Sequence, residues 1–281
     1  MEENQMKTLS RRIFPTVGDL FAMLGIVLGA QVLIGLLLSV VSGFAGFDAE
    51  TATADQLGRY MCILYLASMS LGLIGVLIYR RKRGGTGKVV SFSTARLNPI
   101  LLLWACVFLF AVGVVIEPLL ALLPDMQPKM GSGIWTLVML VVFAPFFEEM
   151  LCRGVVLGSM RAKYGVVAAW LGSSLFFGVL HIAPQLVVNA VLIGLILGYI
   201  CLATGSIWAS ILLHAANNAL AYAMMSVGGG ELLLIDRVGS KGLYAVIYGA
   251  ALIVAALSAW KMWTALRRMK EAEKNQAEAA E

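Results

Sequence analysis

The feature that most constrains this sequence is a series of eight apolar stretches, each long enough to cross a membrane, joined by short loops. A helix needs about 20 apolar residues to span a hydrocarbon core of roughly 30 Å. The stretches are too continuous for the alternating strands of a membrane barrel, and an open sheet cannot satisfy its backbone groups in lipid. We therefore predict an all-α, polytopic membrane helix bundle with about eight transmembrane helices.

The composition agrees with this prediction and leaves no room for a separate soluble domain. Apolar residues make up 60% of the 281 residues, charged residues only 13%, and the mean hydropathy is +0.88. We expect a tail at 1–15, a bundle at 16–265 with its polar motifs within 140–225, and a polar tail at 266–281. The Ala- and Glu-rich part of that tail, from Lys270, should be a frayed helical extension. The predicted spans are 16–44, 57–79, 99–123, 132–157, 166–182, 186–203, 206–226 and 242–265.

Lys and Arg are distributed unevenly between alternate loops. Fifteen fall on the side of the two termini and four on the other side. By the positive-inside rule, both termini face the cytoplasm and the protein is a multi-pass protein of the inner (plasma) membrane. The net charge of +5 comes from these residues along the membrane edge, which have no interleaved aromatics, so no nucleic-acid partner is expected. The four on the other side are Arg59, Lys129, Arg237 and Lys241.

Three ionisable residues lie close together in the predicted span 132–157. Each such residue costs about 2.5–3.5 kcal/mol on insertion scales, so it calls for an explanation. Glu149 and Arg153 stand at i and i+4, share a helix face and can form an ion pair. Glu148 is rotated by about 100° and lacks that partner, which suits a general acid or base. The alternative is that all three lie at the cytoplasmic end of the helix and reach water.

The chain contains only two histidines, and both fall in apolar spans on different predicted helices. His214 and Asn218 stand at i and i+4, so their N–H groups can point at one developing negative oxygen, as in an oxyanion hole. His181 lies on another helix. Taken singly, each histidine is equally compatible with a hydrogen bond between packed helices.

Counting along straight helices places these groups at different depths. At about 1.5 Å per residue from the predicted cytoplasmic ends, His214 lies near 12 Å, Glu148 near 20 Å and His181 near 27 Å. They can meet only if the helices are tilted, broken or shorter than predicted.

Four further polar residues in or beside the spans have no patterned partner. We expect Asn189 and Asn217 to form hydrogen bonds between helices, and Asp19 and Glu117 to be interfacial or helix-pairing residues. None of the four is assigned to the candidate site.

The ordered motifs Glu-Glu-x-x-x-Arg at 148–153, Phe-x-x-x-His at 177–181 and His-x-x-x-Asn at 214–218 resemble a known family. This is the CAAX protease and bacteriocin-processing (CPBP, Abi) family of intramembrane glutamate endopeptidases, related to the Ras-converting CAAX prenyl protease. The resemblance covers roughly 140–225.

The resemblance implies a glutamate-dependent hydrolase without a cofactor or catalytic metal. Glu148 would activate water, with His181 helping to hold it. His214 and Asn218 would stabilise the oxyanion. Glu149 and Arg153 would shape the site and balance its charge.

The implied substrate is a peptide or membrane protein within the lipid bilayer. Eukaryotic members trim prenylated C-termini, whereas signal-like peptides, pheromones or bacteriocin precursors are the alternatives for this chain. The sequence carries no signal for oligomeric state.

Three other functions remain open from the sequence. A zinc peptidase could use a glutamate and both histidines, although no HExxH motif is present and the histidines are 33 residues apart. A proton-coupled transporter could use the same groups as a relay, although no internal repeat supports it. A non-catalytic scaffold or immunity protein could bind a peptide or partner with the same fold.

Overall fold

The computed structural model describes residues 14–85, 91–124, 126, 130–228 and 233–278. Every regular element within these ranges is a helix, which confirms the all-α prediction. The elements are α2 (Val17–Phe44), α3 (Ala54–Lys82), α4 (Pro99–Leu120), α5 (Ile134–Val138), η1 (Met139–Phe143), α6 (Ala144–Glu149), η2 (Met150–Leu157), α7 (Gly158–Val179), α8 (Pro184–Thr204), α9 (Ile207–Gly228), α10 (Leu234–Val238) and α11 (Lys241–Glu278).

Local capping fixes the starts of the first three helices. The Thr16 hydroxyl accepts a hydrogen bond from the Asp19 backbone N–H (3.1 Å) and begins α2. Thr53 and Gln56 form the same reciprocal capping box at α3. Asn98 caps α4 just before a proline at the first helical position.

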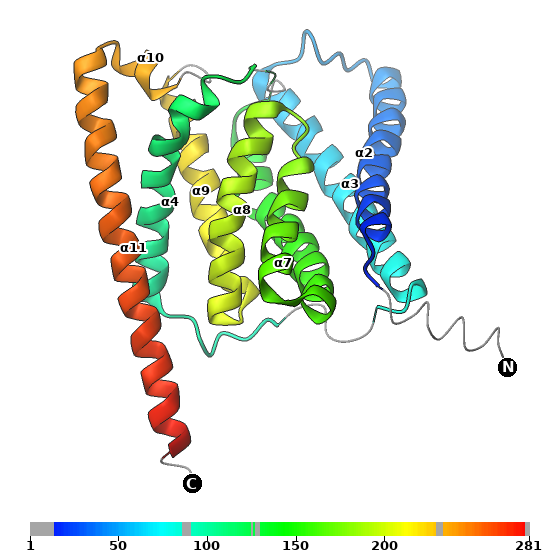
Figure 1. The fold of residues 1–281 in the computed structure, drawn as a ribbon. Helices are drawn as coiled ribbons and strands as arrows, with labels where there is room; N and C mark the ends of the chain where they lie inside the picture. The colour runs from blue at the N-terminus through cyan, green and yellow to red at the C-terminus, as the bar shows by residue number, and fades with distance from the viewer. Residues whose placement is uncertain (1–13, 86–90, 125, 127–129, 229–232, 279–281) are drawn as a thin grey trace, which may run out of the picture.

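The helices form a bundle in which α7, α8 and α9 are central (Figure 1). α2 and α3 pack together at one edge, and α4 and α11 pack together at the other. One buried apolar cluster joins α2, α3, η2 and α7, and a second joins α4, α8, α9 and α11. The two clusters hold the central helices in place from both sides.

Six helices of the described residues are long and apolar enough to cross a membrane. One of the six is the continuous stretch Ile134–Val179, which has 46 residues, and α9 is not among them. The predicted total of about eight spans therefore stays a prediction, while the polytopic helical bundle is confirmed.

One predicted helix end is wrong. The helix predicted at 132–157 continues to a break at Gly165, where φ is 79°, a backbone conformation that glycine adopts most readily. The last helix reaches Glu278, as expected from the helical extension of its span, because its Ala- and Glu-rich tail favours helix without being apolar.

The start of α2 and the end of α11 lie at the same end of the bundle (Figure 1). The basic C-terminal turn of α3, from Arg80 to Lys82, lies at that end as well. This agrees with the expectation that both termini share one side, while the identity of that side and of the membrane stays a prediction. Five residues of the charge count lie outside the described residues: Lys7, Arg11, Arg12, Lys88 and Lys129.

Asp19 joins α2 to α3 at this end. Its buried carboxylate accepts hydrogen bonds from the Tyr79 hydroxyl (2.6 Å) and from Arg83 Nε (2.8 Å). The Thr16 backbone N–H donates to the second carboxylate oxygen at 2.8 Å. Asp19 therefore acts as a helix-pairing residue.

Candidate active site

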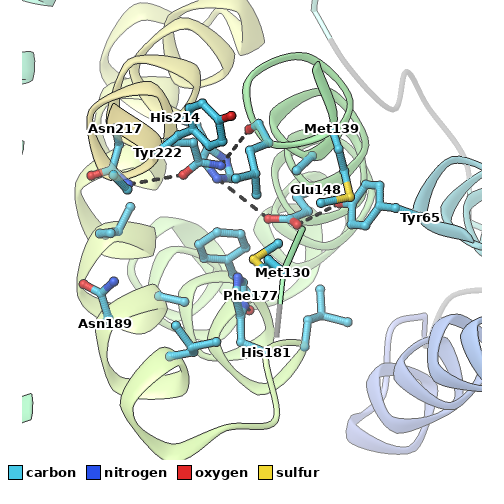
Figure 2. A pocket seen from close by; sticks show the side chains of 18 of the residues that line it. Tyr65, Met130, Met139, Glu148, Phe177, His181, Asn189, His214, Asn217 and Tyr222 are labelled. Carbon is cyan, nitrogen blue, oxygen red and sulfur yellow. Dashed lines mark hydrogen bonds and ion pairs between the residues drawn. The ribbon is translucent and has the colours of Figure 1, made fainter. Parts of the chain in front are cut away.

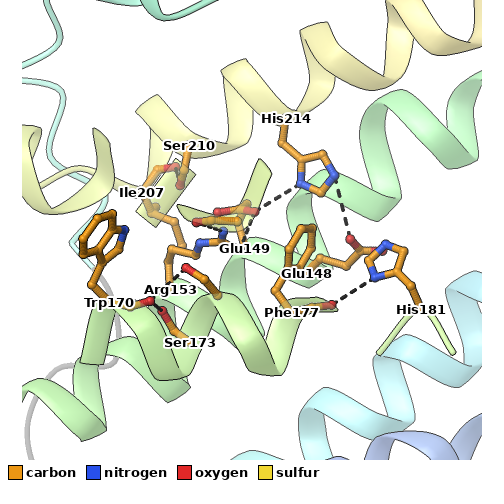
Figure 3. Close-up of polar contacts among 12 residues, drawn as sticks. Glu148, Glu149, Arg153, Trp170, Ser173, Phe177, His181, Ile207, Ser210 and His214 are labelled. Carbon is orange, nitrogen blue, oxygen red and sulfur yellow. Dashed lines mark hydrogen bonds and ion pairs between the residues drawn. The ribbon is translucent and has the colours of Figure 1, made fainter. Parts of the chain in front are cut away.

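The glutamate pair lies on a long helix that contains two π-helical segments. The α-helical turn α6, which ends at Glu149, is flanked by the π-helical segments η1 and η2. Such segments are frequent at functional sites because they redirect side chains within a continuous helix. Here Glu148 faces a cavity, whereas Glu149 is fully buried behind it (Figure 3).

Glu149 and Arg153 form the ion pair that their spacing predicts. Arg153 Nη1 donates to Glu149 Oε1 at 3.0 Å, and both side chains are completely buried. Arg153 Nη2 also donates to the Gly194 carbonyl (2.9 Å), and its guanidinium lies 4.7 Å from the Phe177 ring centroid. This burial contradicts the alternative in which the charged groups reach water at a helix end.

The His214 ring lies between the two carboxylates. Its Nδ1 is 3.1 Å from Glu149 Oε1, and its Nε2 is 3.8 Å from Glu148 Oε2. A carboxylate that is paired with Arg153 only accepts hydrogen bonds, so Nδ1 must carry the proton. The 3.8 Å separation is too long for a direct hydrogen bond, yet one oxygen atom can lie about 2.8 Å from both atoms.

His181 follows the end of α7 and faces the same cavity. Its Nδ1 lies 2.9 Å from the Phe177 carbonyl, which can only accept, so Nδ1 carries the proton. In the neutral ring the lone pair is then on Nε2. The rings of His181 and His214 pack edge-on against Phe177, with centroids 5.1 Å and 5.5 Å away.

Asn218 is held by a backbone carbonyl that a proline leaves without a partner. In η1 the backbone hydrogen bonds join residue i to residue i+5, as the bond from the Ala144 N–H to the Met139 carbonyl shows. In the same pattern the Leu140 carbonyl would accept a hydrogen bond from the N–H of residue 145. Pro145 has no N–H. Asn218 Nδ2 donates to the Leu140 carbonyl at 2.9 Å, which leaves its second N–H for another acceptor.

Tyr65 is a site residue that the sequence analysis missed. Its hydroxyl donates to Glu148 Oε1 at 2.8 Å from α3, a helix that carries none of the predicted site residues. The available signal was a tyrosine in the middle of an apolar span, because a buried phenol usually finds a hydrogen-bond partner.

These groups surround one cavity of about 540 Å³ (Figure 2). Four of the six predicted site residues line it, and Glu149 and Arg153 lie behind its wall. The lining four are Glu148, His181, His214 and Asn218. Asn189 and Asn217, which were expected only to join helices, also lie in the wall, and Asn217 donates to Asn218 Oδ1 at 3.3 Å.

The separate depths expected from straight helices are wrong. Glu148 and His214 approach to 3.8 Å, and both histidines contact one phenylalanine. The helix that carries Glu148 extends past 157 and contains two π-helical segments, so a uniform rise counted from the predicted end misplaces its residues.

No group of three or more His, Cys, Asp or Glu side chains within the described ranges is arranged to hold a metal ion. Glu149, one acid of the predicted site, is instead bound by Arg153 and by His214 Nδ1.

Residues 130–220 match the family model described as type II CAAX prenyl endopeptidase Rce1-like. The matched segment contains all six predicted site residues, but neither Tyr65 nor α10 and α11. No curated protein and no solved structure matches the chain. The match supports an endopeptidase of the CAAX-protease type in a membrane.

Proposed function

Because residues 130–220 match the type II CAAX prenyl endopeptidase family, we propose that this protein is an intramembrane endopeptidase that hydrolyses a peptide bond with a glutamate-activated water. The observation that carries the proposal is the approach of Glu148 Oε2 to His214 Nε2 across one cavity, at 3.8 Å. This separation leaves a position that both groups can reach and that a reacting oxygen can occupy.

Glu148 is the general base. It accepts a proton from water while the water oxygen attacks the carbonyl carbon of the scissile bond. His181 holds the same water through the lone pair on Nε2, because its Nδ1 proton is bound to the Phe177 carbonyl. When the C–N bond breaks, Glu148 passes its proton to the leaving nitrogen, and the products are a carboxylic acid and an amine.

The oxyanion of the tetrahedral intermediate is stabilised from α9. Asn218 offers the N–H that is not bound to Leu140. His214 can donate from Nε2 only as an imidazolium, since its Nδ1 proton is bound to Glu149. One such donor contributes about 10²- to 10³-fold in rate.

Glu149 and Arg153 set the charge of the site without touching substrate. Both lie behind the cavity wall, where Arg153 compensates the carboxylate that orients His214. The hydrogen bonds of the six residues and their positions at the cavity support these proposed roles.

The test is cleavage of a fluorogenic peptide library by the purified protein in detergent. Glu148→Gln keeps the shape of the side chain and an oxygen that can accept from Tyr65, but removes the base; we expect a loss of at least about 10³-fold. Glu50→Gln, at an exposed loop position, is the matched control and should retain full activity.

A zinc chelator is added in a parallel reaction. Unchanged cleavage supports the glutamate mechanism, whereas loss of cleavage with chelator favours a metallopeptidase. Absence of cleavage of every peptide by the unmodified protein would contradict the proposal and favour the transporter and scaffold alternatives.

We further propose that the protein lies in the inner (plasma) membrane with both termini in the cytoplasm, as the distribution of Lys and Arg indicates. Single cysteines introduced at Glu50 and at Glu271, into a background without the native cysteines, test this orientation. A membrane-impermeant thiol reagent added to intact cells should label position 50 and not position 271. The reverse pattern would overturn the orientation.

A further inference from the structure

The cavity extends well beyond Glu148, toward the end of the bundle where α10 lies. In that direction its wall is formed by Tyr222, Met224 and Met225 of α9 and by Arg237 of α10. Among the described residues that line the cavity, Arg237 is the only lysine or arginine. The largely apolar wall of this cavity thus contains one acidic residue, Glu148, and one basic residue, Arg237.

Arg237 is held at the wall by backbone contacts. Its Nη1 donates to the Met224 carbonyl at 2.9 Å, which fixes the guanidinium against α9. The start of α10 is fixed as well, because the Leu234 N–H donates to Glu117 Oε1 at 2.7 Å. Glu117 also interacts electrostatically with Arg237 and with the exposed Asp236, and its Oε1 holds the start of α10.

The distance along the cavity from His214 to Arg237 corresponds to a few residues of an extended peptide. His214 and Met224 are ten residues apart on α9, which is about 15 Å along a helix. An extended peptide covers about 3.3 Å per residue. A chain whose scissile carbonyl lies at His214 therefore reaches Arg237 about four residues farther along.

The wall of the cavity is also rich in methionine. Met130, Met139 and Met224 all line the cavity. Flexible thioether side chains adapt to apolar groups of different shapes, so they select weakly among substrate side chains. A cation in such surroundings can form a charge-assisted, bidentate pair with a carboxylate, and that pair can set the register of the peptide.

We propose that Arg237 forms a subsite for an anionic group of the substrate, about four residues from the scissile bond. The group is a carboxylate, either the C-terminus of the peptide or an Asp or Glu side chain. This inference rests on the proposed peptidase function, because it locates the scissile bond at Glu148 and His214.

The test uses one apolar fluorogenic peptide that the unmodified protein cleaves, prepared in four forms. Two carry Asp or Asn four residues from the cleavage site, and two end at that distance in a free carboxylate or an amide. We expect kcat/KM to be about 10- to 100-fold higher for the preferred anionic form, the range for one charge-assisted contact. The pair that shows the difference identifies which source of carboxylate is bound.

Arg237→Gln should remove this preference by lowering kcat/KM on the anionic form alone, mainly through KM. Arg237→Glu should invert it in favour of a peptide with Lys at the same position. The matched control is Arg59→Gln, since Arg59 is exposed near the start of α3 and does not line the cavity. That start lies at the same end of the bundle as α10 (Figure 1). That variant should keep the preference.

The outcomes separate this inference from the proposed function. Cleavage of all four peptides at equal rates, unchanged in Arg237→Gln, would overturn the subsite and leave the peptidase intact. An equal loss on anionic and neutral peptides would assign Arg237 a structural role and also overturn it. Failure of the unmodified protein to cleave any peptide would reject both.

Discussion

The buried ion pair behind the active site makes a quantitative prediction about stability. Arg153→Met keeps an unbranched apolar stem but removes the guanidinium, with its charge and its hydrogen bonds. The Glu149 carboxylate, which is fully buried, then loses the guanidinium that compensates its charge and keeps His214 and Ser210 as neighbours. The substitution tests whether Arg153 compensates a charge that has no access to water.

The expected cost follows from the burial of both groups. Breaking a buried ion pair by removing one partner costs about 3–5 kcal/mol, because the remaining charge is not solvated. Arg153 also contacts the Phe177 ring, a cation–π interaction that contributes about 0.5–2 kcal/mol. We therefore expect the free energy of unfolding to fall by at least about 3 kcal/mol.

Arg83→Met is the matched control. Arg83 also pairs with a buried carboxylate, that of Asp19, at 2.8 Å, but the Arg83 side chain is 38% exposed. Without Arg83, Asp19 still accepts hydrogen bonds from Tyr79 and from the Thr16 backbone. The expected loss is about 1 kcal/mol, as for a partly exposed pair.

Both variants are measured by reversible unfolding in mixed detergent micelles, with the tryptophan fluorescence of the protein as signal. The double variant Glu149→Gln, Arg153→Met should recover much of the stability that Arg153→Met loses, because no uncompensated charge remains. Equal losses for Arg153→Met and Arg83→Met, or no recovery in the double variant, would refute the electrostatic reasoning.

Three further substitutions give separate predictions. Tyr65→Phe removes the 2.8 Å hydrogen bond to Glu148 and should lower kcat about tenfold with little change in KM. Equal changes in kcat and KM, measured by steady-state kinetics, would contradict a positioning role for Tyr65. Asn218→Ala should lower kcat by about 10²- to 10³-fold, whereas Asn217→Ala should lower it much less. Similar cleavage rates for the two variants in the peptide assay would contradict a role of Asn218 in the oxyanion hole. Gly165→Ala places a side chain on a backbone with φ of 79°, where it is sterically strained. The free energy of unfolding should fall by about 1 kcal/mol and kcat should not change. Unaltered stability in the micelle titration would refute the strain.

The sequence predicted the helices well where hydropathy decides and poorly where it does not. The span that became α4 begins as expected at Pro99, where a proline and the Asn98 cap coincide with the apolar boundary. The helical segment 158–164 was missed because it is polar and continues a preceding helix, whereas the helical extension of the last span was expected from its Ala- and Glu-rich sequence.

The candidate site was predictable along each helix but not between helices. The spacing of Glu149 and Arg153 predicted an ion pair that the structure contains, because both residues lie on one helix. The contact of Tyr65 with Glu148 joins positions 83 residues apart and depends on how two helices cross. A single sequence carries no direct signal for such a crossing.

The π-helical turn at Met139–Phe143 has a consequence for which chain lengths this helix tolerates. Such a turn contains one residue more than an α-helical turn would, and deleting one residue there would allow the regular register to return. The π-helical turn takes up its additional residue locally, so the residues beyond it, Glu148 included, would keep nearly the same direction. A deletion that no such turn takes up would rotate Glu148 by about 100° about the helix axis and away from the cavity. Homologous chains can therefore be expected to differ by a single residue in the length of this segment and still direct the glutamate into the cavity.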